Sequence, residues 1–365
     1  MGRAIYYYEQ DKRSGNTMQM NHTSKLQQNR MRKTMIAVIR GTGSYIPPRV
    51  VENEELKNYI ETNDTWIRER TGIERRHVVT DDTVASMAVE AGKAALENAG
   101  IQAESLELII VSTTSPTQMI PCNACLVQKE LGAVKAACFD LNAACSGFIT
   151  AYQTACAYIE SGSYQKILVI GSEALSCITD WSDRSTCILF GDGAGAVVLT
   201  AEAGEKQVSV CGADGRMGDA LTLYSGYSSN PFGTQEPMQR AAADDSGKNA
   251  CVRMDGQAIF RFAVRKVPQL IEELLQKNSL QKEDIKYYIL HQANERIVEA
   301  VAKRTGQPIE KFPMNVQEYG NTSSASVPIL LDELCRDGRV KAGDRLVIAG
   351  FGGGLTWAAS VVTWR

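Results

Sequence analysis

The sequence predicts an α/β protein built from two similar halves. Short apolar runs, typical of strands buried on both faces, alternate along the chain with amphipathic helical patterns. The order of strand-like runs, reactive residues and glycine-rich turns in the first half returns in the second half. With 365 residues, the chain is long enough to bury the cores of two such halves.

The elements of the first half follow from their apolar spacing. We expect a first strand at residues 36–39 and a helix at 84–99, which ends where Gly100 follows. Pro121 suits the first turn of a helix that ends near Gly132. The other expected elements are strands at 106–111, 136–141, 167–170 and 195–199, the last after a glycine-rich turn, and a helix at 146–161.

The second half repeats this order with low sequence identity. The run 287–290 resembles the run 108–111, and 190–198 resembles 351–362. Asn321 precedes an expected helix at 327–334, much as Cys145 precedes the helix at 146–161. These matches predict halves at 35–205 and 206–365, with the reactive residues at their junction, where facing loops build a concave pocket.

Residues 1–34 differ from the rest of the chain. They are polar, lack periodicity and carry seven Lys or Arg against two acidic residues. We interpret them as a disordered leader. A start codon assigned too far upstream is favoured over an organelle transit peptide, because the segment is poor in Ser. Since the net charge is -3, the remaining chain is acidic, which argues against nucleic acid as the main partner.

Composition favours a soluble cytoplasmic protein. We find no secretory signal and no apolar run long enough to span a membrane. The ten cysteines are scattered, mostly within apolar patterns, so buried free thiols are expected. Cys122 and Cys125 form a C-x-x-C pair, but no second pair follows at zinc-ribbon spacing, so we expect them to pack and predict no metal site.

Three residues carry the predicted chemistry. Cys145 lies between an expected strand and an expected helix, where free backbone N–H groups and the helix dipole favour the thiolate. We therefore expect a thiol pKa below its ordinary value of roughly 8.5. His291 and Asn321 lie in the second half, His291 at the end of an apolar run. A Cys, a His and an Asn in these positions indicate acyl chemistry through a thioester.

These residues and the motifs around them resemble β-ketoacyl-[acyl-carrier-protein] synthase III, the condensing enzyme family that starts fatty acid synthesis. The resemblance covers about residues 36–365 and implies a thiolase-like fold, with two duplicated halves in an α-β-α-β-α arrangement, and a homodimer. The further motifs that carry it are GTGSYIP at 41–47, WI at 66–67, RTGI at 70–73, DRST at 183–186, HQAN at 291–294, NTSSAS at 321–326 and GFGGGLTW at 350–357.

The resemblance also implies roles for the reactive residues. Cys145 would take an acyl group from acyl-CoA, and His291 and Asn321 would donate hydrogen bonds to the thioester oxygen of the malonyl carrier during loss of CO₂. The backbone N–H groups of Cys145 and Gly353 would form the oxyanion hole. No cofactor or metal is expected, because the thioester carbonyl is itself the electron sink.

Binding roles are implied for residues outside the catalytic set. The expected CoA contacts are Thr62, Trp66, Arg70, Arg184 and Asn294, with the adenine between Trp66 and Arg184. The expected contacts to the acidic acyl carrier protein are Gln292, Ala293, Asn294, Glu295, Arg296 and Lys303, with Arg304, Arg261 and Arg265 as further bases. The expected acyl pocket consists of Ile120, Leu189, Phe190 and Leu355. Many relatives have Phe where Ile120 and Leu355 stand, so longer or branched primers would have room.

Other functions compete with this interpretation. A papain-type hydrolase has the same Cys-His-Asn order, and His291 lies 146 residues after Cys145, but the papain-type nucleophile signature is missing. A hydroxymethylglutaryl-CoA synthase would carry a Glu where this chain has Thr113-Thr114. An inactive carrier-binding subunit would not need Cys145. A starter-unit synthase of a polyketide or other secondary-metabolite pathway would share every catalytic residue and stays open.

Overall fold

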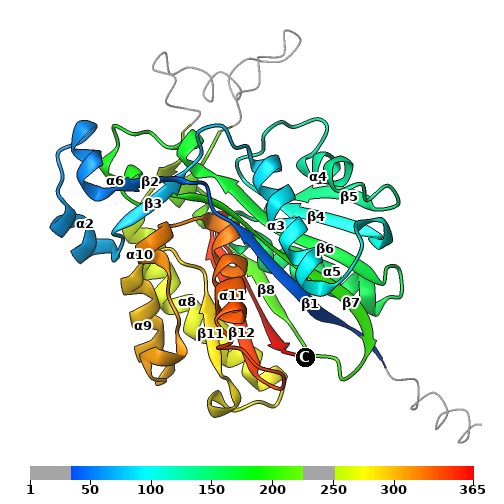
Figure 1. The fold of residues 1–365 in the computed structure, drawn as a ribbon. Helices are drawn as coiled ribbons and strands as arrows, with labels where there is room; N and C mark the ends of the chain where they lie inside the picture. Colours follow the sequence, from blue (N-terminus) through cyan, green and yellow to red (C-terminus); the bar gives the residue numbers. More distant parts are fainter. Residues whose placement is uncertain (1–33, 225–250) are drawn as a thin grey trace, which may run out of the picture.

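The fold is built on two sheets, which lie in different layers of the molecule (Figure 1). The structure, a computed structural model, describes residues 34–224 and 251–365. The predicted leader therefore lies outside the described residues, apart from Thr34. No helix in the described ranges combines the length and the apolar character needed to cross a membrane.

The first sheet has five strands among the described residues, in the order β1-β7-β6-β4-β5. β4 is parallel to β5 and β6, whereas β7 is antiparallel to β1 and β6. The strands are β1 (Met35–Tyr45), β4 (Leu108–Ser112), β5 (Ala137–Leu141), β6 (Lys166–Ala174) and β7 (Asp192–Ala203). All strands predicted from apolar runs in the first half are present.

The second sheet has four strands among the described residues, in the order β11-β12-β13-β8. β11 is parallel to β12, and the other pairs are antiparallel. The strands are β8 (Val210–Ala213), β11 (Tyr287–Leu290), β12 (Arg345–Gly352) and β13 (Thr356–Thr363). The two sheets fall on either side of the predicted boundary at 205/206, but the division into two duplicated halves stays a prediction.

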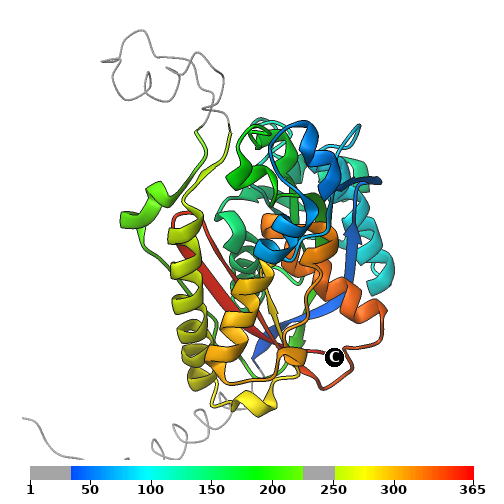
Figure 2. The same cartoon turned by 90° about the vertical axis from the view of Figure 1, so that its left-hand side faces the viewer.

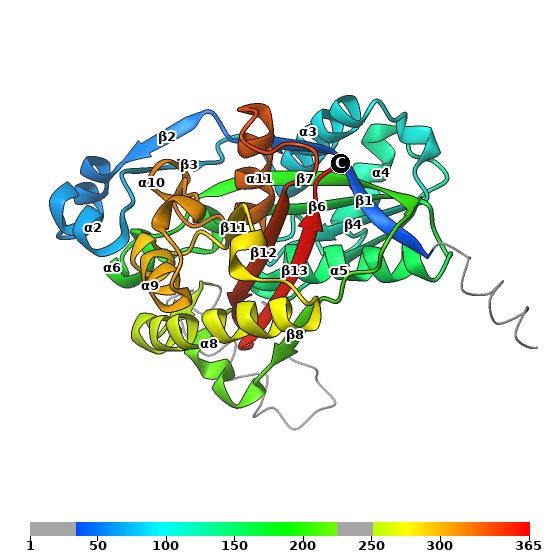
Figure 3. The same cartoon turned by 90° about the horizontal axis from the view of Figure 1, so that it is seen from below.

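Six helices complete the layers, four of them on the outer faces of the sheets and two at the centre. One apolar core joins the first sheet to the second through side chains of the two central helices, α5 and α11. Two further cores pack α3 and α4 on the outer face of the first sheet and α8 and α9 on the outer face of the second. Figures 2 and 3 show α8 running along that outer face. The helices are α3 (Val84–Ala99), α4 (Asn123–Leu131), α5 (Gly147–Glu160), α8 (Gly256–Lys277), α9 (Glu295–Thr305) and α11 (Ser326–Arg336).

The layers therefore follow the order α-β-α-β-α that the sequence interpretation implied. One local expectation was wrong. The glycine-rich stretch before residue 195 is no turn, because β7 already begins at Asp192. Glycine is needed here for close packing, since a Cβ on Gly195 would lie 2.6 Å from the backbone nitrogen of Ile329 in α11.

The two central helices begin in the same way. Each follows a three-residue 3-10 turn, Ala144–Ser146 before α5 and Ser323–Ala325 before α11. The first residue of each turn has a left-handed backbone, with φ of 47° at Ala144 and 48° at Ser323. Such conformations are uncommon outside glycine and are held in place by the surrounding structure. Both turns lie at the junction of the two sheets.

Smaller elements extend from the first sheet at the left of Figure 1. The β2–β3 hairpin carries α2 between its strands, and α6 and α10 lie close to it. A further short pair, β9 with β10, lies on either side of the undescribed residues 225–250. The bounds are β2 (Arg49–Glu52), α2 (Asp64–Thr71), β3 (Arg75–Val78), α6 (Arg184–Cys187), β9 (Leu221–Thr222), β10 (Arg253–Met254) and α10 (Val316–Tyr319).

Candidate active site

Cys145 lies in the turn between β5 and α5, enclosed by the second sheet. The backbone of β12 passes directly against it: a Cβ on Gly352 would lie 2.8 Å from the Cβ of Cys145 and 3.1 Å from its Sγ. A side chain at this position would clash with the thiol, so Gly352 lets the second half close over the nucleophile of the first.

Asn321 and His291 are held from the second half. The N–H of Asn321 donates to the carbonyl of Leu189 at 2.8 Å, and its side chain is 6% exposed. His291 directly follows β11 and continues its pairing, since its N–H donates to the carbonyl of Ala349 at 2.8 Å. The ring of His291 stands edge-on to Phe351, with 5.4 Å between the ring centroids. Backbone pairing therefore fixes the position of both residues.

Ser323 connects the three predicted catalytic residues. Its backbone N–H donates to Oδ1 of Asn321 at 2.9 Å, and its side chain lies beside the Cys145 thiol, whose pKa it lowers. Its carbonyl accepts a hydrogen bond at 2.9 Å from Ser326, whose Oγ lies 2.7 Å from Nδ1 of His291. The structure thus brings Cys145, His291 and Asn321 around one turn, which the sequence interpretation did not single out.

The electrostatics of the thiol differ from our expectation. Burial raises the pKa of Cys145 to about 12, against a hydrogen bond with Ser323 that lowers it. Burial also lowers the pKa of His291 to about 3. The expected depressed thiol pKa is therefore wrong: desolvation of the thiolate outweighs the favourable backbone dipoles of the turn. At neutral pH the site holds a neutral thiol beside a neutral imidazole.

A cavity of about 370 Å³ opens at Cys145 and carries an apolar wall. Gly353, Ala144 and Ser323 line it beside the thiol, and the oxyanion role of Gly353 stays a prediction. The apolar part of the lining comes from Leu175, Ile178, Phe190, Leu221, Leu223 and Val252. The arrangement offers a nucleophile, nearby backbone donors and a space that suits an acyl chain.

Of the four predicted acyl-pocket residues, the structure places Phe190 alone on the wall of this cavity. Phe190 lines the cavity, but the side chain of Ile120 is 89% exposed and that of Leu355 is fully buried in the core under the second sheet. Leu189 packs into neighbouring apolar clusters and does not line the cavity either. Sequence motifs gave no signal for the residues of the turn after β6 and of β9 that form the wall instead, because the wall assembles from separate segments.

Known proteins support the interpretation over almost the whole described chain. Residues 139–215 match the family described as 3-Oxoacyl-[acyl-carrier-protein (ACP)] synthase III, and residues 275–364 match its C-terminal part. A β-ketoacyl-[acyl-carrier-protein] synthase III of Clostridium perfringens is 46% identical over 89% of this chain and 98% of its own. The chain belongs to this family.

Solved structures of the synthase III family agree. That of 3-oxoacyl-[acyl-carrier-protein] synthase III from Aquifex aeolicus superimposes with a TM-score of 0.81 at 40% identity, covering 90% of this chain and all of the other. The priming β-ketosynthase of a polyketide biosynthetic pathway gives a TM-score of 0.84 at 34% identity, covering 91% and 97%. The predicted family, the thiolase-like fold and the assignment as an acyltransferase are confirmed.

The CoA residues expected of a synthase III gather on α2 and α6. The guanidinium of Arg70 lies 4.3 Å from the ring centroid of Trp66, and that of Arg184 lies 4.6 Å from it. Trp66 is half-buried, whereas both arginines are exposed. Without substrate, Arg184 thus lies on the indole that was predicted to receive the adenine, and it also donates to the carbonyl of Glu61 at 3.3 Å.

The remaining CoA candidates lie beside this pair. Asn294 begins α9, and its Nδ2 donates to the carbonyl of Arg70 at 3.0 Å, which joins the CoA helix α2 to α9. The hydroxyl of Thr62 is buried and has no hydrogen-bond partner in the described part of the chain. An unpaired buried hydroxyl next to α2 is consistent with a ligand contact.

The predicted carrier contacts divide by exposure. Gln292 is 1% exposed, with its side chain bonded to the backbone of Leu290 and Asn315, so its assignment as a surface contact is wrong. Ala293, Asn294 and Glu295 are partly exposed. The basic face, defined as Arg261 and Arg265 of α8 with Arg296, Lys303 and Arg304 of α9, is exposed on two packed helices.

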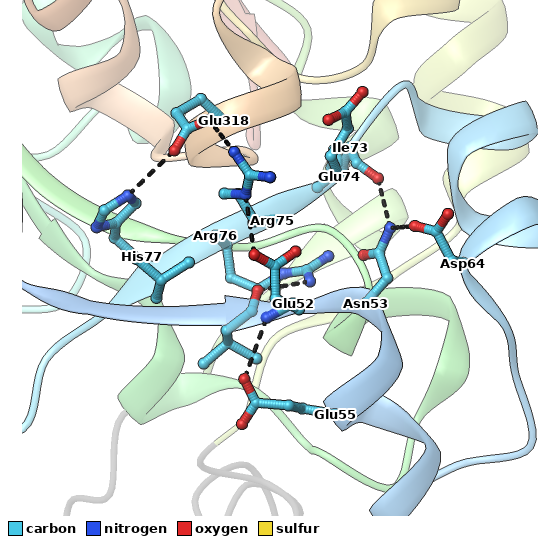
Figure 4. Close-up of polar contacts among 12 residues, drawn as sticks. Glu52, Asn53, Glu55, Asp64, Ile73, Glu74, Arg75, Arg76, His77 and Glu318 are labelled. Atoms are coloured by element: carbon cyan, nitrogen blue, oxygen red, sulfur yellow. Dashed lines mark hydrogen bonds and ion pairs between the residues drawn. The ribbon is translucent and has the colours of Figure 1, made fainter.

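A polar network outside the predicted set braces the loop of Asn321 (Figure 4). Arg75 of β3 donates to Glu318 of α10 at 2.8 Å and to Glu52 of β2 at 3.1 Å. His77 lies 3.6 Å from the same Glu318. Because Glu318 precedes Asn321 by three residues, the hairpin that carries α2 also supports the loop of Asn321. Charged residues spaced this widely give no sequence signal.

The expectation of buried thiols holds only in part, because Cys187 is buried whereas Cys177 and Cys211 are exposed. The Sγ atoms of Cys122 and Cys125 lie 3.5 Å apart. Burial raises the pKa of Cys122 and of Cys138 beside it, so these thiols stay neutral. Within the described residues, no group of three or more His, Cys, Asp or Glu is arranged to hold a metal ion.

Proposed function

We propose that this protein condenses an acyl-CoA primer with a malonyl-acyl carrier protein through an acyl-Cys145 intermediate, as the first step of cytoplasmic fatty acid synthesis. The observation that carries this proposal is the turn at Ser323, which contacts Cys145 and Asn321 directly and His291 through Ser326, beside an apolar cavity. We infer the reaction class from family membership and the residues of each step from this geometry.

In the loading step, Sγ of Cys145 attacks the thioester carbonyl of the acyl-CoA. The C–S bond to CoA breaks, and the thiol proton leaves with the CoA thiolate, so charge and atoms balance. The negative oxygen formed in between is stabilised by the N–H groups of Cys145 and Gly353, two residues that line the cavity. A single donor of this kind contributes roughly 10²–10³ in rate in other enzymes.

In the condensation step, the carboxyl group of the malonyl thioester leaves as CO₂, and its electron pair moves toward the thioester oxygen. His291 and Asn321 donate hydrogen bonds to that oxygen, where charge develops. The enolate carbon then attacks the acyl carbon and releases the Cys145 thiolate, which takes up a proton from solvent. Neutral imidazole suits this donor role, because it needs one N–H and no charge.

Ser326 decides which ring nitrogen of His291 carries the proton. Its hydroxyl has one hydrogen and two acceptors in reach, the Ser323 carbonyl at 2.9 Å and Nδ1 of His291 at 2.7 Å. When the hydroxyl donates to Nδ1, the neutral ring carries its proton on Nε2 and can donate it to substrate. We assign this orientation to the condensation step.

Acyl-CoA binds at α2 and α6 in this proposal. The adenine enters between Trp66 and Arg184, and Arg70 lies near the phosphates. An indole and a guanidinium both present flat faces to a base, and Arg also pairs with phosphate. The acyl carrier protein docks on the basic face, where five exposed cations lie together on α8 and α9.

A homodimer is the assembly we propose. β5 pairs only with β4 in the described residues, so its other edge is open, and exposed edges of this kind pair with further strands. Apolar side chains near this edge are also exposed, with Ile120 at 89% and Val134 at 76%. In such a dimer Ile120 is placed to contact the partner.

Intact-mass spectrometry with a panel of acyl-CoAs tests the proposal. We expect a covalent acyl adduct on the wild-type protein, none on Cys145→Ala, and loss of the adduct after addition of malonyl-acyl carrier protein. Cys177→Ala, at an exposed cysteine outside the cavity, is the matched control and should load normally. Loading of Cys145→Ala, or an adduct that malonyl carrier does not remove, would contradict the mechanism.

A second candidate is the priming of a polyketide or other secondary-metabolite pathway. The observation that favours it is the similarity to the priming β-ketosynthase described above. The same experiment separates the two functions when it is run with the carrier proteins of both pathways. Turnover with the fatty acid carrier supports fatty acid initiation, whereas turnover restricted to a polyketide carrier supports priming.

A further inference from the structure

Glu173 is a buried charge that the mechanism above does not use. It lies on β6 of the first sheet, and its side chain is 0% exposed. No ion pair involves it among the described residues. A carboxylate buried without a cation costs free energy unless hydrogen bonds satisfy its oxygens. The hydrogen-bond partners of Glu173 therefore indicate its role.

Those partners come from both halves of the active site. Oε2 accepts hydrogen bonds from the Thr114 N–H at 2.9 Å, the Thr114 hydroxyl at 3.0 Å and the Ser115 hydroxyl at 2.8 Å. Thr114 also lines the cavity beside Cys145. Oε1 accepts from the Ser324 hydroxyl at 2.8 Å. Ser324 follows Ser323 in the turn that contacts Cys145, Asn321 and, through Ser326, His291.

We propose that Glu173 is a positioning residue whose carboxylate fastens the turn after Asn321 to the cavity wall at Thr114. The distance between that turn and the cavity wall then stays the same while CoA leaves and the malonyl carrier enters. This inference rests on the proposed function, because it assigns Glu173 to the condensation step. Loading needs only Cys145 and the backbone donors, whereas condensation needs the turn of Asn321 in place.

The same placement gives Glu173 an effect on the thiol. After burial, which is the main cause, the negative charge of Glu173 also raises the pKa of Cys145. His291, the other titratable group at the thiol, is neutral. Glu173 therefore helps to keep the unloaded thiol protonated. Removal of its charge should shift ionisation of Cys145 to lower pH.

Two variants separate the two effects. Ser324→Ala removes the hydrogen bond to the second half and leaves the charge. Glu173→Gln removes the charge but keeps the shape, because the Ser324 hydroxyl can accept from the new amide and donate to the Ser112 carbonyl, 3.1 Å away. Asp332→Asn is the control. Asp332 is 3% exposed and also joins the halves, through Thr42 at 2.8 Å, but it lies outside the cavity.

The experiment measures acyl loading, condensation by preloaded enzyme, and the pH dependence of Cys145 alkylation by iodoacetamide. We expect Ser324→Ala to slow condensation about tenfold or more with loading within about threefold, in line with loss of positioning. We expect Glu173→Gln to move the alkylation curve to lower pH by roughly one unit. Asp332→Asn should change neither quantity.

Equal losses of loading and condensation in Ser324→Ala, or the same losses in Asp332→Asn, would overturn the positioning role. An alkylation curve of Glu173→Gln that coincides with that of the wild type would overturn the effect on the thiol. Failure of the wild-type protein to load any acyl-CoA would instead count against the proposed function. The alkylation curves remain interpretable in that case, because they require no substrate.

Discussion

At the scale of single residues, the site combines a thiol that resists ionisation with an imidazole that resists protonation. Burial causes both effects, since each charged form would lose its hydration. The resting site is therefore not the thiolate–imidazolium pair of papain-type proteases. A neutral His291 is suited to donate a hydrogen bond to a developing oxyanion, which argues further against the hydrolase alternative.

The pH dependence of Cys145 alkylation follows from its pKa of about 12. Because the thiolate is the reactive form, we expect the iodoacetamide rate to rise about tenfold per pH unit from pH 7 to 10. Stopped-flow or mass-spectrometric rates with Cys145→Ala as the background check this. A rate that is already constant near pH 7 would contradict a buried neutral thiol.

His291 makes stability depend on pH. Its folded pKa of about 3 lies below the ordinary value of 6.5, so the unfolded chain binds the proton more readily. Its neutral burial therefore weakens the fold as pH falls from about 6.5 toward 3. We expect His291→Asn, which has no such titration, to lose less thermal stability than the wild type between pH 7 and 5. Parallel curves of melting temperature against pH would exclude this contribution.

At the scale of elements, two helices carry residues that we propose to bind the substrates. α2 carries the CoA residues and α9 begins the basic face, and Asn294 joins them by its bond to the carbonyl of Arg70. The two proposed binding surfaces therefore meet at this hydrogen bond. Substitutions on one surface should affect one substrate only.

Trp66→Ala should weaken acyl-CoA binding. Loss of the stacking surface is expected to raise KM for acyl-CoA about tenfold, with little change for the malonyl carrier, since stacking on an aromatic ring contributes roughly 1–3 kcal/mol per base. Tyr59→Ala removes a nearby exposed aromatic ring and serves as the control. An unchanged KM for acyl-CoA would exclude adenine stacking on Trp66.

Arg296→Glu should weaken carrier docking. Reversal of one charge on the basic face is expected to raise KM for the malonyl carrier by tenfold or more at low salt, roughly 1–2 kcal/mol, and to spare acyl loading. Lys93→Glu reverses an exposed charge on α3, away from this face, as the control. Equal effects on loading and condensation would place Arg296 elsewhere in the mechanism.

At the scale of the whole molecule, the site exists only where both sheets meet. Cys145 follows a strand of the first sheet. The second half of the chain supplies Gly352, Ser323, and His291 with Asn321, the two proposed hydrogen-bond donors to the thioester oxygen. The open edge of β5 is where we propose that a second copy of the chain pairs to form a homodimer. We expect a solution mass near twice the 39.9 kDa of the chain, measured by light scattering. A mass of one chain at micromolar concentration would contradict the dimer.

Local patterns predicted much of this molecule. The strands around Leu108 and Tyr287 and the helix that ends at Gly100 were predicted because apolar spacing and capping residues act over a few positions. Cys145, His291 and Asn321 were recognised because their motifs are specific in combination. The structure brings them together, while their catalytic roles stay proposals until tested.

Properties that depend on distant contacts could not be predicted. The burial that sets the Cys145 pKa comes from β12, about 200 residues away in the sequence. Gln292 stands in a polar motif but turns inward to the backbone of Asn315. Glu173 was not considered, because a lone acidic residue near the end of a strand has no pattern until Ser324 is placed beside it.

The matching turns before α5 and α11 imply a division of labour within one backbone design. Ala144 and Ser323 adopt the same left-handed conformation, yet one turn presents a thiol and the other presents the contacts that arrange its partners. Neither turn carries both the thiol and the contacts to Asn321 and His291. A chain cut near residue 205 would therefore yield two fragments that are each inert, and activity would return only on their reassociation.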